Sequence, residues 1–507
     1  MSTPADARIE RLLQECAAHA AAGRAAQAWT ACERILHSAP NHPLALAKQS
    51  ELALAAGDLN RAEQLARRNA QANPQSAQAQ MSLGTVLGRR NQADAAQAAF
   101  EQAAALEPAN PLPYTRLAAM QLQRGQPAAA ETEADRALER DPRFAEALLI
   151  RARCDVARGM PEQAVMRLVR VAPHTLDPDL RMAYYFDLAT AQEAGRKPDQ
   201  AMASFHEANR LFGLHKLPRN LDREALPKQL IHAIGRFSPE WAATWPPAPP
   251  EEFAAPTFVV GFPQAGGELL MRVLCAHPRI AVAWEEDLLA DVKKALGPGA
   301  WPDVLAQLDG DRIRALRMLL RHAIKRRLGE LTPGTQLIVK RMLNIHEAGL
   351  IHRLLPSARF LLMLRHPADH CLSAFTRRCP QTMHAPQLLT LEGSVKLYAQ
   401  TMSLWLRTAQ ALPQLHALPV RYEQLTGDSL QCAQGVLNFL GVPWSDTVRA
   451  WRAAPVNRAR FGAQGAPAIK PPPTDPRWRA QLHTLRPYMP ILKPYLDAFG
   501  YASSQQK

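Results

Sequence analysis

The sequence predicts an α-helical repeat array followed by an α/β domain with a mostly parallel sheet. Two observations carry this prediction. In the first half of the chain, proline recurs every 34 residues, at Pro40, Pro74, Pro108 and Pro142. In the second half, short apolar runs at 257–262 and 360–364 are each followed by glycine-containing or polar segments. Such runs are typical of buried strands in a parallel sheet.

Two other residue types follow the same 34-residue period. Each expected turn between two helices holds a residue that adopts a positive φ at low cost, namely Gly23, Gly57, Asn91, Gly125 and Gly159. A small alanine follows five residues later and allows two helices to approach closely: Ala28, Ala62, Ala96, Ala130 and Ala164. Each proline suits the start of the next repeat, because its φ is fixed and it lacks an N–H group. A sixth, irregular unit is expected at 182–213.

These units resemble tetratricopeptide repeats, whose helix–turn–helix unit is about 34 residues long. The resemblance implies a curved solenoid with a concave face that binds a peptide or protein partner. A plain bundle of alanine-rich helices is the alternative. We place the repeat solenoid in residues 1–213, a linker that contains the proline-rich stretch 245–250 in residues 214–256, and a second domain in residues 257–501.

The composition of the 507-residue chain indicates which partners and which compartment to expect. The net charge of +14 favours anionic ligands, but the basic stretch 311–327 has apolar residues at helical spacing. We therefore expect an amphipathic helix with a solvated basic face there, not a nucleic-acid site. No apolar run approaches the length of about 18 residues that predicts a membrane span, and the first residues do not resemble a signal peptide. The seven cysteines form no CxxC pair, so we expect neither a zinc site nor a disulfide framework, and a reducing, cytoplasmic location.

A glycine-containing loop follows the apolar run 257–262 and leads into the apolar segment 269–274, which reads as a buried helix. The loop consists of Gln264, Ala265, Gly266, Gly267 and Glu268. A strand, a glycine loop and a helix together suit phosphate binding, because backbone N–H groups and the positive end of the helix point at the anion. Many α/β proteins have a glycine at such a turn, so this prediction depends on the neighbouring segments.

A second polar group follows the apolar run 360–364. Arg365 comes directly after that run, and Ser373 lies eight residues further along the chain. An arginine and a serine at the carboxyl end of a strand suit a second phosphate. Ser373 and Arg377 are one helical turn apart, so both can face the same phosphate group.

Six segments in order give residues 257–501 a resemblance to the sulfotransferases that use 3′-phosphoadenosine-5′-phosphosulfate (PAPS). The glycine loop and the segment 365–373 resemble the family signatures G-x-P-R-S-G-T-T-L-L and R-D-P-x-D-x-x-x-S. The other matching segments are 277–278, 420–425, 439–444 and 477–479. The similarity is greatest to bacterial sulfotransferases fused to tetratricopeptide repeats and to tyrosylprotein sulfotransferases. It implies a three-layer, P-loop-like sulfotransferase fold, with PAPS as co-substrate and no metal.

The resemblance also implies roles for individual residues. Glu285 matches the carboxylate that takes the proton from the acceptor hydroxyl, and Lys340 matches the lysine that stabilises the transferring sulfuryl group. The matches to the 3′-phosphate ligands are Arg365, Ser373 and Arg377, and the matches to the groups that close over the adenine and the phosphate are Tyr422 and Arg477. The alternative for Glu285 is an acid at the start of a helix, and the alternative for Lys340 is a surface lysine at the end of a strand.

The chain departs from the family pattern at the glycine loop. The family's Arg-Ser-Gly-Thr-Thr is replaced by residues 264–268, so a cation and three hydroxyl groups are absent and a carboxylate is added. Residues 457–473 contain neither serine nor threonine, where the family tends to have a serine that touches the sulfuryl group. His366 replaces an aspartate of the second signature. The candidates to supply the missing charge are Arg272, Arg341 and Lys470.

The sequence leaves three functions to be weighed. The leading expectation is sulfuryl transfer from PAPS to a hydroxyl or amine acceptor. The solenoid favours a peptide or protein as the molecule that carries this acceptor group. The alternative is a catalytically inactive sulfotransferase-like scaffold that binds a protein partner through its repeats. A P-loop phosphotransferase is disfavoured, because the loop lacks the Gly-Lys-Ser/Thr ending that binds phosphate and magnesium.

Overall fold

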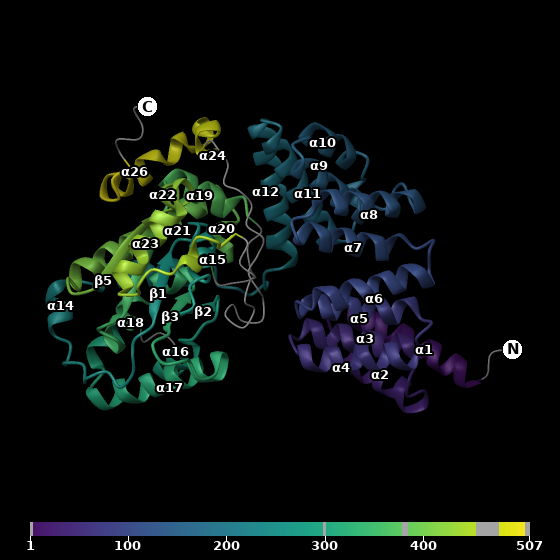
Figure 1. Cartoon of the computed structure of the whole chain (residues 1–507), viewed down its shortest axis with the longest axis horizontal. Helices are drawn as coiled ribbons and strands as arrows, with labels where there is room; N and C mark the ends of the chain where they lie inside the picture. The colour runs from purple at the N-terminus through teal and green to yellow at the C-terminus, as the bar shows by residue number, and fades with distance from the viewer. Residues whose placement is uncertain (1–3, 298–300, 378–383, 453–475, 502–507) are drawn as a thin grey trace. The chain divides into compact units, whose positions relative to one another are not determined.

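The computed structural model describes residues 4–297, 301–377, 384–452 and 476–501 (Figure 1). The chain forms two compact units, Met1–Lys197 and Pro198–Lys507. The first unit is entirely helical in its described residues, and the second contains the sheet. Each unit is described by itself below.

The first unit is a row of antiparallel helix pairs (Figure 1). Its elements are α1 (Pro4–Ala21), α2 (Ala25–Ser38), α3 (Pro43–Ala55), α4 (Leu59–Ala72), α5 (Ala77–Arg89), α6 (Ala93–Leu106), α7 (Pro111–Gln123), α8 (Pro127–Arg140), α9 (Ala145–Ala157), α10 (Pro161–Leu168), η1 (Pro173–Thr175) and α11 (Pro178–Ala194). The turn residues have the positive φ that the period predicted, for example 80° at Gly57 and 58° at Asn91. The helical repeat array predicted from the sequence is therefore confirmed.

The periodic alanines lie where successive helices come closest together. All five, Ala28, Ala62, Ala96, Ala130 and Ala164, have no exposed surface. A methyl group fills the space between two helices at these positions, and each repeat needs its neighbours to bury its apolar face. The 34-residue period is thus a packing period as well as a sequence period.

The boundary between the two compact units falls at 197–198, inside the sixth repeat predicted at 182–213. Helix α12 (Pro198–His215) belongs to the second unit, where Asn209 donates a hydrogen bond of 2.9 Å to the Phe375 carbonyl. The ring of Phe205 also packs edge-on against the Phe375 ring. The domain boundaries 1–213, 214–256 and 257–501 remain predictions, but α12 packs with the α/β unit.

The second unit is built on a five-stranded sheet in which every pair of neighbouring strands is parallel. The strands are β1 (Thr257–Gly261), β2 (Ile280–Trp284), β3 (Gln336–Lys340), β4 (Arg359–Leu364) and β5 (His416–Arg421). Their order in the sheet is β2-β3-β1-β4-β5, so β1 is central. Successive connections run to both sides of β1, which defines a doubly wound sheet with a switch point at β1.

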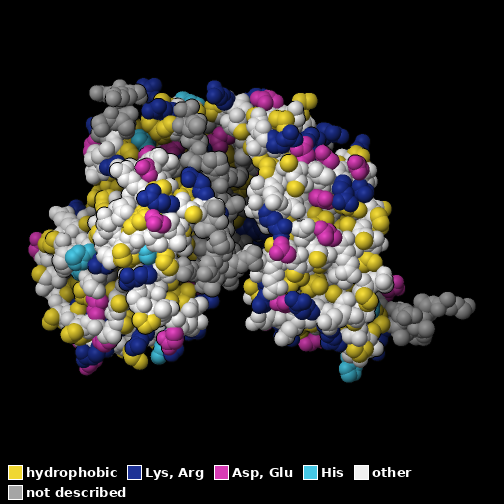
Figure 2. Space-filling model, viewed as in Figure 1, with side chains coloured by type: hydrophobic (Ala, Val, Ile, Leu, Met, Phe, Trp, Pro, Cys, Tyr) yellow, Lys and Arg dark blue, Asp and Glu magenta, His cyan; other side chains and the backbone are white. Residues whose placement is uncertain are grey.

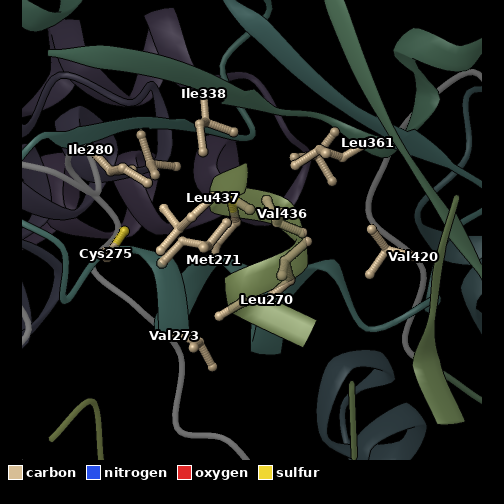
Figure 3. Close-up of a cluster of buried hydrophobic side chains, with 14 of the residues drawn as sticks. Leu270, Met271, Val273, Cys275, Ile280, Ile338, Leu361, Val420, Val436 and Leu437 are labelled. Atoms are coloured by element: carbon tan, nitrogen blue, oxygen red, sulfur yellow. The ribbon is translucent and has the colours of Figure 1, made fainter. Parts of the chain in front are cut away.

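Helices cover both faces of this sheet. On one face, α15 (Gly267–Leu274) and α23 (Ser429–Leu440) pack on Ile338, Leu361 and Val420 (Figure 3). On the other face, α21 (Leu391–Ala411) places Trp405 edge-on to Phe360, with ring centroids 6.0 Å apart. Strand residues alternate between the two cores because successive side chains point to opposite faces. The predicted three-layer α/β domain is confirmed.

The remaining helices of the second unit connect these layers. They are α13 (Ala225–Arg236), α14 (Pro239–Ala243), α16 (Ala290–Leu296), η2 (Asp303–Gln307), α17 (Gly310–Leu328), η3 (Met342–Ile345), α18 (Ala348–Leu354), α19 (Pro367–Phe375), α20 (Ala385–Leu388), α22 (Tyr422–Gly427), η4 (Asp446–Val448), α24 (Arg477–Ala480), α25 (Leu482–Leu485), η7 (Arg486–Tyr488) and α26 (Met489–Ala498). No helix within the described ranges is long and apolar enough to cross a membrane.

The basic helix α17 has one arginine that the amphipathic prediction does not explain. Arg317 is buried, and it donates hydrogen bonds to the carbonyls of Pro249, Pro250 and Leu354 at 2.6–2.9 Å. Its guanidinium therefore fixes the end of the proline-rich stretch on the α/β unit. Elsewhere on the face shown in Figure 2, Lys and Arg side chains are interspersed with Asp and Glu.

We expect Ala130→Leu to destabilise the first unit by about 1–3 kcal/mol, because a larger side chain has no space at a fully buried helix contact. Chemical unfolding followed by circular dichroism measures the change. Ala129→Leu on the same helix is the control, since Ala129 is exposed. Equal stability of the two variants would contradict the packing role of the periodic alanines.

Candidate functional site

The residues singled out in the sequence follow the carboxyl ends of different strands. Glu285 follows β2, Lys340 is the last residue of β3, Arg365 follows β4, and Tyr422 follows β5. The glycine loop follows the central strand β1. Because all five strands are parallel, these groups lie at one edge of the sheet, which is where ligands bind in open α/β folds. The fold thus brings together segments that are up to 165 residues apart in the printed sequence.

The glycine loop is held in an uncommon backbone conformation. Gln264 has a φ of 74°, and Gly266, the N-terminal cap of α15, has a φ of 87°. A β-carbon on Gly266 would lie 2.3 Å from Cδ2 of Tyr422, so only glycine fits there. A β-carbon on Gly267 would lie 3.4 Å from Cε of Lys340. The loop therefore lies between the tyrosine ring on one side and the lysine on the other.

Lys340 and Glu285 form an ion pair at the ends of two adjacent strands. Lys340 is 3% exposed, its ammonium contacts Oε1 of Glu285, and it lies 4.7 Å from the centroid of the Trp284 ring. The backbone N–H of Glu285 donates a 2.8 Å hydrogen bond to the Lys340 carbonyl. Glu285 has a φ of 52°, and its side chain is 43% exposed. A buried cation is thus paired with a carboxylate that solvent can reach.

Arg365 connects the second polar group to the glycine loop. Its guanidinium donates hydrogen bonds to Oδ2 of Asp369 at 2.6 Å and to the Gln264 carbonyl at 3.1 Å. It also lies over the ring of Tyr422, 4.4 Å from the centroid. Burial raises the pKa of the Tyr422 hydroxyl, and the Arg365 charge opposes this rise. Arg365 therefore holds the loop, the tyrosine and α19 together.

Ser373 is buried, and its hydroxyl oxygen has no hydrogen-bond partner among the described residues. A buried polar atom without a partner is costly in a folded protein, so the atom needs an explanation. Ser373 lies on α19, which begins two residues after Arg365. Arg377, just beyond this helix, is exposed. Arg477 donates a 2.9 Å hydrogen bond to the hydroxyl of Thr376, the residue that precedes Arg377.

A layer of side chains packs next to the Arg365–Asp369 pair, and the family resemblance implies no ligand-binding role for these side chains. His366 stacks on Trp478, with ring centroids 4.2 Å apart and an interplanar angle of 2°. The backbone N–H of His366 donates to Oε1 of Glu423 at 2.9 Å, and Tyr501 donates to Oε2 at 2.9 Å. Asp369, which binds Arg365, also accepts a 3.2 Å hydrogen bond from the Trp478 N–H. The sequence signals for His366, Glu423 and Trp478 were their places within the matched segments, whereas Tyr501 lies outside those segments.

A network of charged side chains lies next to the candidate base. Lys293 contacts Oδ2 of Asp287 and Oε1 of Glu347, each at 2.9 Å. Burial alone would lower the pKa of Lys293, but the Glu347 and Asp287 carboxylates outweigh it and raise the pKa. Arg341 lies 3.3 Å from Asp287. Asp287 is two residues beyond Glu285, so this network borders the place where an acceptor would approach Glu285.

The three candidates for the missing loop charge differ in their positions. Arg341 is paired with Asp287 in the network, so its charge is already compensated. Arg272 lies in the last turn of α15, at the end of the helix away from the loop. Lys470 lies outside the described residues, as does the segment 457–473. Glu268 lies in the first turn of α15, where the helix dipole favours a carboxylate.

Comparison with known proteins finds a family match within the second unit. Residues 256–446 match the model of a sulfotransferase family. Protein-tyrosine sulfotransferase 2 from chicken (Gallus gallus) is 26% identical over 251 residues, which make up 46% of this chain and 60% of that protein. The resemblance of residues 256–446 to a sulfotransferase family, predicted from the sequence, is therefore confirmed. The chain spans only 60% of the length of this relative.

Among solved structures, similarity is found to helical proteins. A tetratricopeptide repeat protein from Parabacteroides merdae covers 41% of this chain, and 84% of its own chain is matched, with 16% identity and a TM-score of 0.32. PilF from Pseudomonas aeruginosa covers 41% of this chain and 94% of its own, with 16% identity and a TM-score of 0.36.

We expect His366 to make the protein less stable in mild acid. Burial lowers the pKa of His366 from an ordinary 6.5 to about 4, so the unfolded chain binds a proton in this range that the folded chain does not. The stability that a neutral His366 contributes is complete above pH 6.5 and is lost as the pH falls towards 4, by up to about 3 kcal/mol.

His366→Phe keeps a ring against Trp478 and removes this proton site. Urea unfolding at several pH values should therefore show a smaller loss of stability between pH 6.5 and 4 than in the parent protein. Exposed His322→Phe is the control and should leave the pH dependence unchanged. An unchanged pH dependence in His366→Phe would show that His366 is accessible to protons in the folded state.

Proposed function

We propose that the protein transfers a sulfuryl group from PAPS to a hydroxyl or amine acceptor. The observation that carries this proposal is the position of the Glu285–Lys340 pair beside the glycine loop, at the carboxyl edge of the sheet. A proton acceptor and a buried cation thus stand next to a backbone cradle for an anion. This combination supplies what sulfuryl transfer requires at one place.

The residues present fit the nucleotide. The unpartnered Ser373 hydroxyl lies in the half-site that the resemblance assigns to the 3′-phosphate, together with Arg365 and Arg377. In the glycine loop, residues 264–268, a side chain at Gly266 would meet Tyr422 and one at Gly267 would meet Lys340, so the loop backbone stays uncovered by side chains at these two positions. The loop N–H groups would hold the 5′-phosphosulfate, and Tyr422 and Arg477 would close over the adenine and the 3′-phosphate.

In the proposed reaction, the acceptor oxygen or nitrogen attacks sulfur while the bond from sulfur to the bridging phosphate oxygen breaks. Glu285 takes the proton of the acceptor, and its partly exposed carboxylate is open to that side. The Lys340 ammonium stabilises the charge that develops on the leaving oxygen. In the free protein the two groups neutralise one another, which keeps the buried Lys340 charge paired.

A catalytically inactive scaffold is the second candidate, and the loop favours it. Gln264 provides no cation, and Glu268 places a carboxylate where an incoming 5′-phosphosulfate would be repelled. The Gln264 carbonyl is also held by Arg365. Such a protein would keep the fold and the 3′-phosphate half-site and act through its repeats.

The repeats and the chicken relative both bear on the acceptor and the partner. The chicken relative is named as a protein-tyrosine sulfotransferase, and helical repeats commonly bind peptides. We therefore propose a peptide or protein as the acceptor or partner. A cytoplasmic location remains our expectation from the cysteine pattern.

We expect Ser373→Ala to weaken binding of 3′-phosphoadenosine-5′-phosphate by about 5–20-fold, because one hydrogen bond to a charged phosphate is lost. The Ser373 hydroxyl has no hydrogen-bond partner in the described part of the chain, so the variant should keep the parent melting temperature. Calorimetric titration measures the affinity. Ser394→Ala is the matched control, since its hydroxyl is also buried and without a partner but lies on α21.

Equal weakening by both serine variants would contradict a 3′-phosphate site at Ser373. An absence of binding to the parent protein at millimolar nucleotide would overturn the proposed activity and leave the scaffold.

The double change Gln264→Arg and Glu268→Thr restores the cation and one hydroxyl of the family loop. If the protein is an inactive scaffold, this variant should bind the nucleotide at least about tenfold more tightly, because it gains a charge-assisted hydrogen bond and loses a repulsive carboxylate. Calorimetric titration with the same nucleotide measures the affinity of the double variant, and Gln264→Ala is the control. A parent protein that already binds as tightly would instead support an active enzyme with an altered loop.

A further inference from the structure

Two cysteines of the first helix pair face one another. Cys16 lies on α1 and Cys32 on α2, and their sulfur atoms are 3.0 Å apart. Cys16 is 2% exposed, and Cys32 has no exposed surface. A disulfide bond length is about 2.05 Å, so a movement of about 1 Å separates the two thiols from bonding distance. The sequence pattern alone did not indicate this pairing.

We propose that Cys16 and Cys32 are a site of oxidative modification, at which a peroxide converts the two thiols into a disulfide. The proposal does not depend on the proposed function, since it concerns the helical repeats alone. Cys16 donates a hydrogen bond to the Ala28 carbonyl at 3.4 Å, so in the contact between the two sulfur atoms the Cys32 S–H donates and the Cys16 sulfur accepts. The two sulfur atoms are therefore already arranged as donor and acceptor.

An apolar environment explains which sulfur reacts first. The pair lies among Leu12, Ala31 and Ile35, and burial raises the pKa of Cys32, with its contact to Cys16 adding to the rise. Cys32 is thus held as a thiol. Cys16 also lines a groove of about 460 Å³ formed by α1, α3, α5 and α7, so a molecule the size of hydrogen peroxide can reach it from the groove. Cys16 is the residue that meets the oxidant.

The reaction balances with hydrogen peroxide as the only oxidant. The Cys16 sulfur attacks one peroxide oxygen and the oxygen–oxygen bond breaks, which forms a sulfenic acid; the leaving hydroxide takes up the proton that the Cys16 thiol loses and becomes the first water. The Cys32 sulfur then attacks the Cys16 sulfur, the sulfur–oxygen bond breaks, and water leaves after taking the Cys32 proton. Two thiols lose two electrons, and one peroxide is reduced to two waters. The product joins α1 to α2 and closes the first helix pair covalently.

The other described cysteines lie on other elements. Cys154, Cys275 and Cys371 are buried, and Cys432 is half-buried. No group of three or more metal-ligating side chains occurs in the described part of the chain. The geometry thus points to oxidation between Cys16 and Cys32.

Peptide mapping of the full-length protein tests the proposal directly. After treatment with one equivalent of hydrogen peroxide, trypsin releases Cys16 in peptide 12–24 and Cys32 in peptide 25–34. We expect these two peptides to be linked, with a mass lower by two hydrogen atoms than their sum, and to separate on reduction. Cys16→Ser should abolish the link, whereas Cys154→Ser, a buried cysteine of another repeat, should leave it intact.

Thermal unfolding provides a second readout that needs no variant. Closing a loop of this length should raise the melting temperature of the oxidised parent protein by about 5 °C, and a reductant should reverse the shift. Recovery of 12–24 and 25–34 as separate peptides, both still alkylated by iodoacetamide after denaturation, would overturn the proposal. Sulfinic acid on Cys16 without a link to Cys32 would overturn it as well.

Discussion

The candidate site depends on the ion pair between Arg365 and Asp369. Both side chains are buried, so each charge would be costly without the other. Arg365 uses its remaining donors on the Gln264 carbonyl, while Asp369 accepts from the backbone of Trp478. Two buried charges therefore connect the glycine loop, α19 and α24. Removing either charge would release segments that come from three distant parts of the chain.

Parallel strands explain why so much of this arrangement was predictable. The apolar runs at β1 and β4 predicted buried strands, and the polar residues that follow them predicted groups at a common edge. The alanine period likewise predicted which positions are buried between helices, and all five are fully buried. These features depend on local sequence and on the sheet's parallel topology, both of which leave a clear pattern.

The contacts that the sequence did not predict join residues that are far apart along the chain. The Glu285–Lys340 pair depends on the register of β2 and β3, which places Trp284 opposite Lys340. The stack of His366 on Trp478 and the burial of Arg317 against the linker depend on how loops pack after the strands have formed. The contact of Cys16 with Cys32 depends on helix rotation, which a spacing of 16 residues does not determine. No periodic pattern encodes any of these contacts.

The contact of Gly266 with Tyr422 has a consequence for how this domain can diverge. The ring occupies the space that any β-carbon at position 266 would need, and the backbone there has a φ of 87°. Positions 266 and 422 therefore cannot vary independently. Among homologues, a residue other than glycine at 266 is expected only together with a smaller side chain at 422 and a relaxed loop backbone. The two positions should consequently covary, although they are 156 residues apart in the printed numbering.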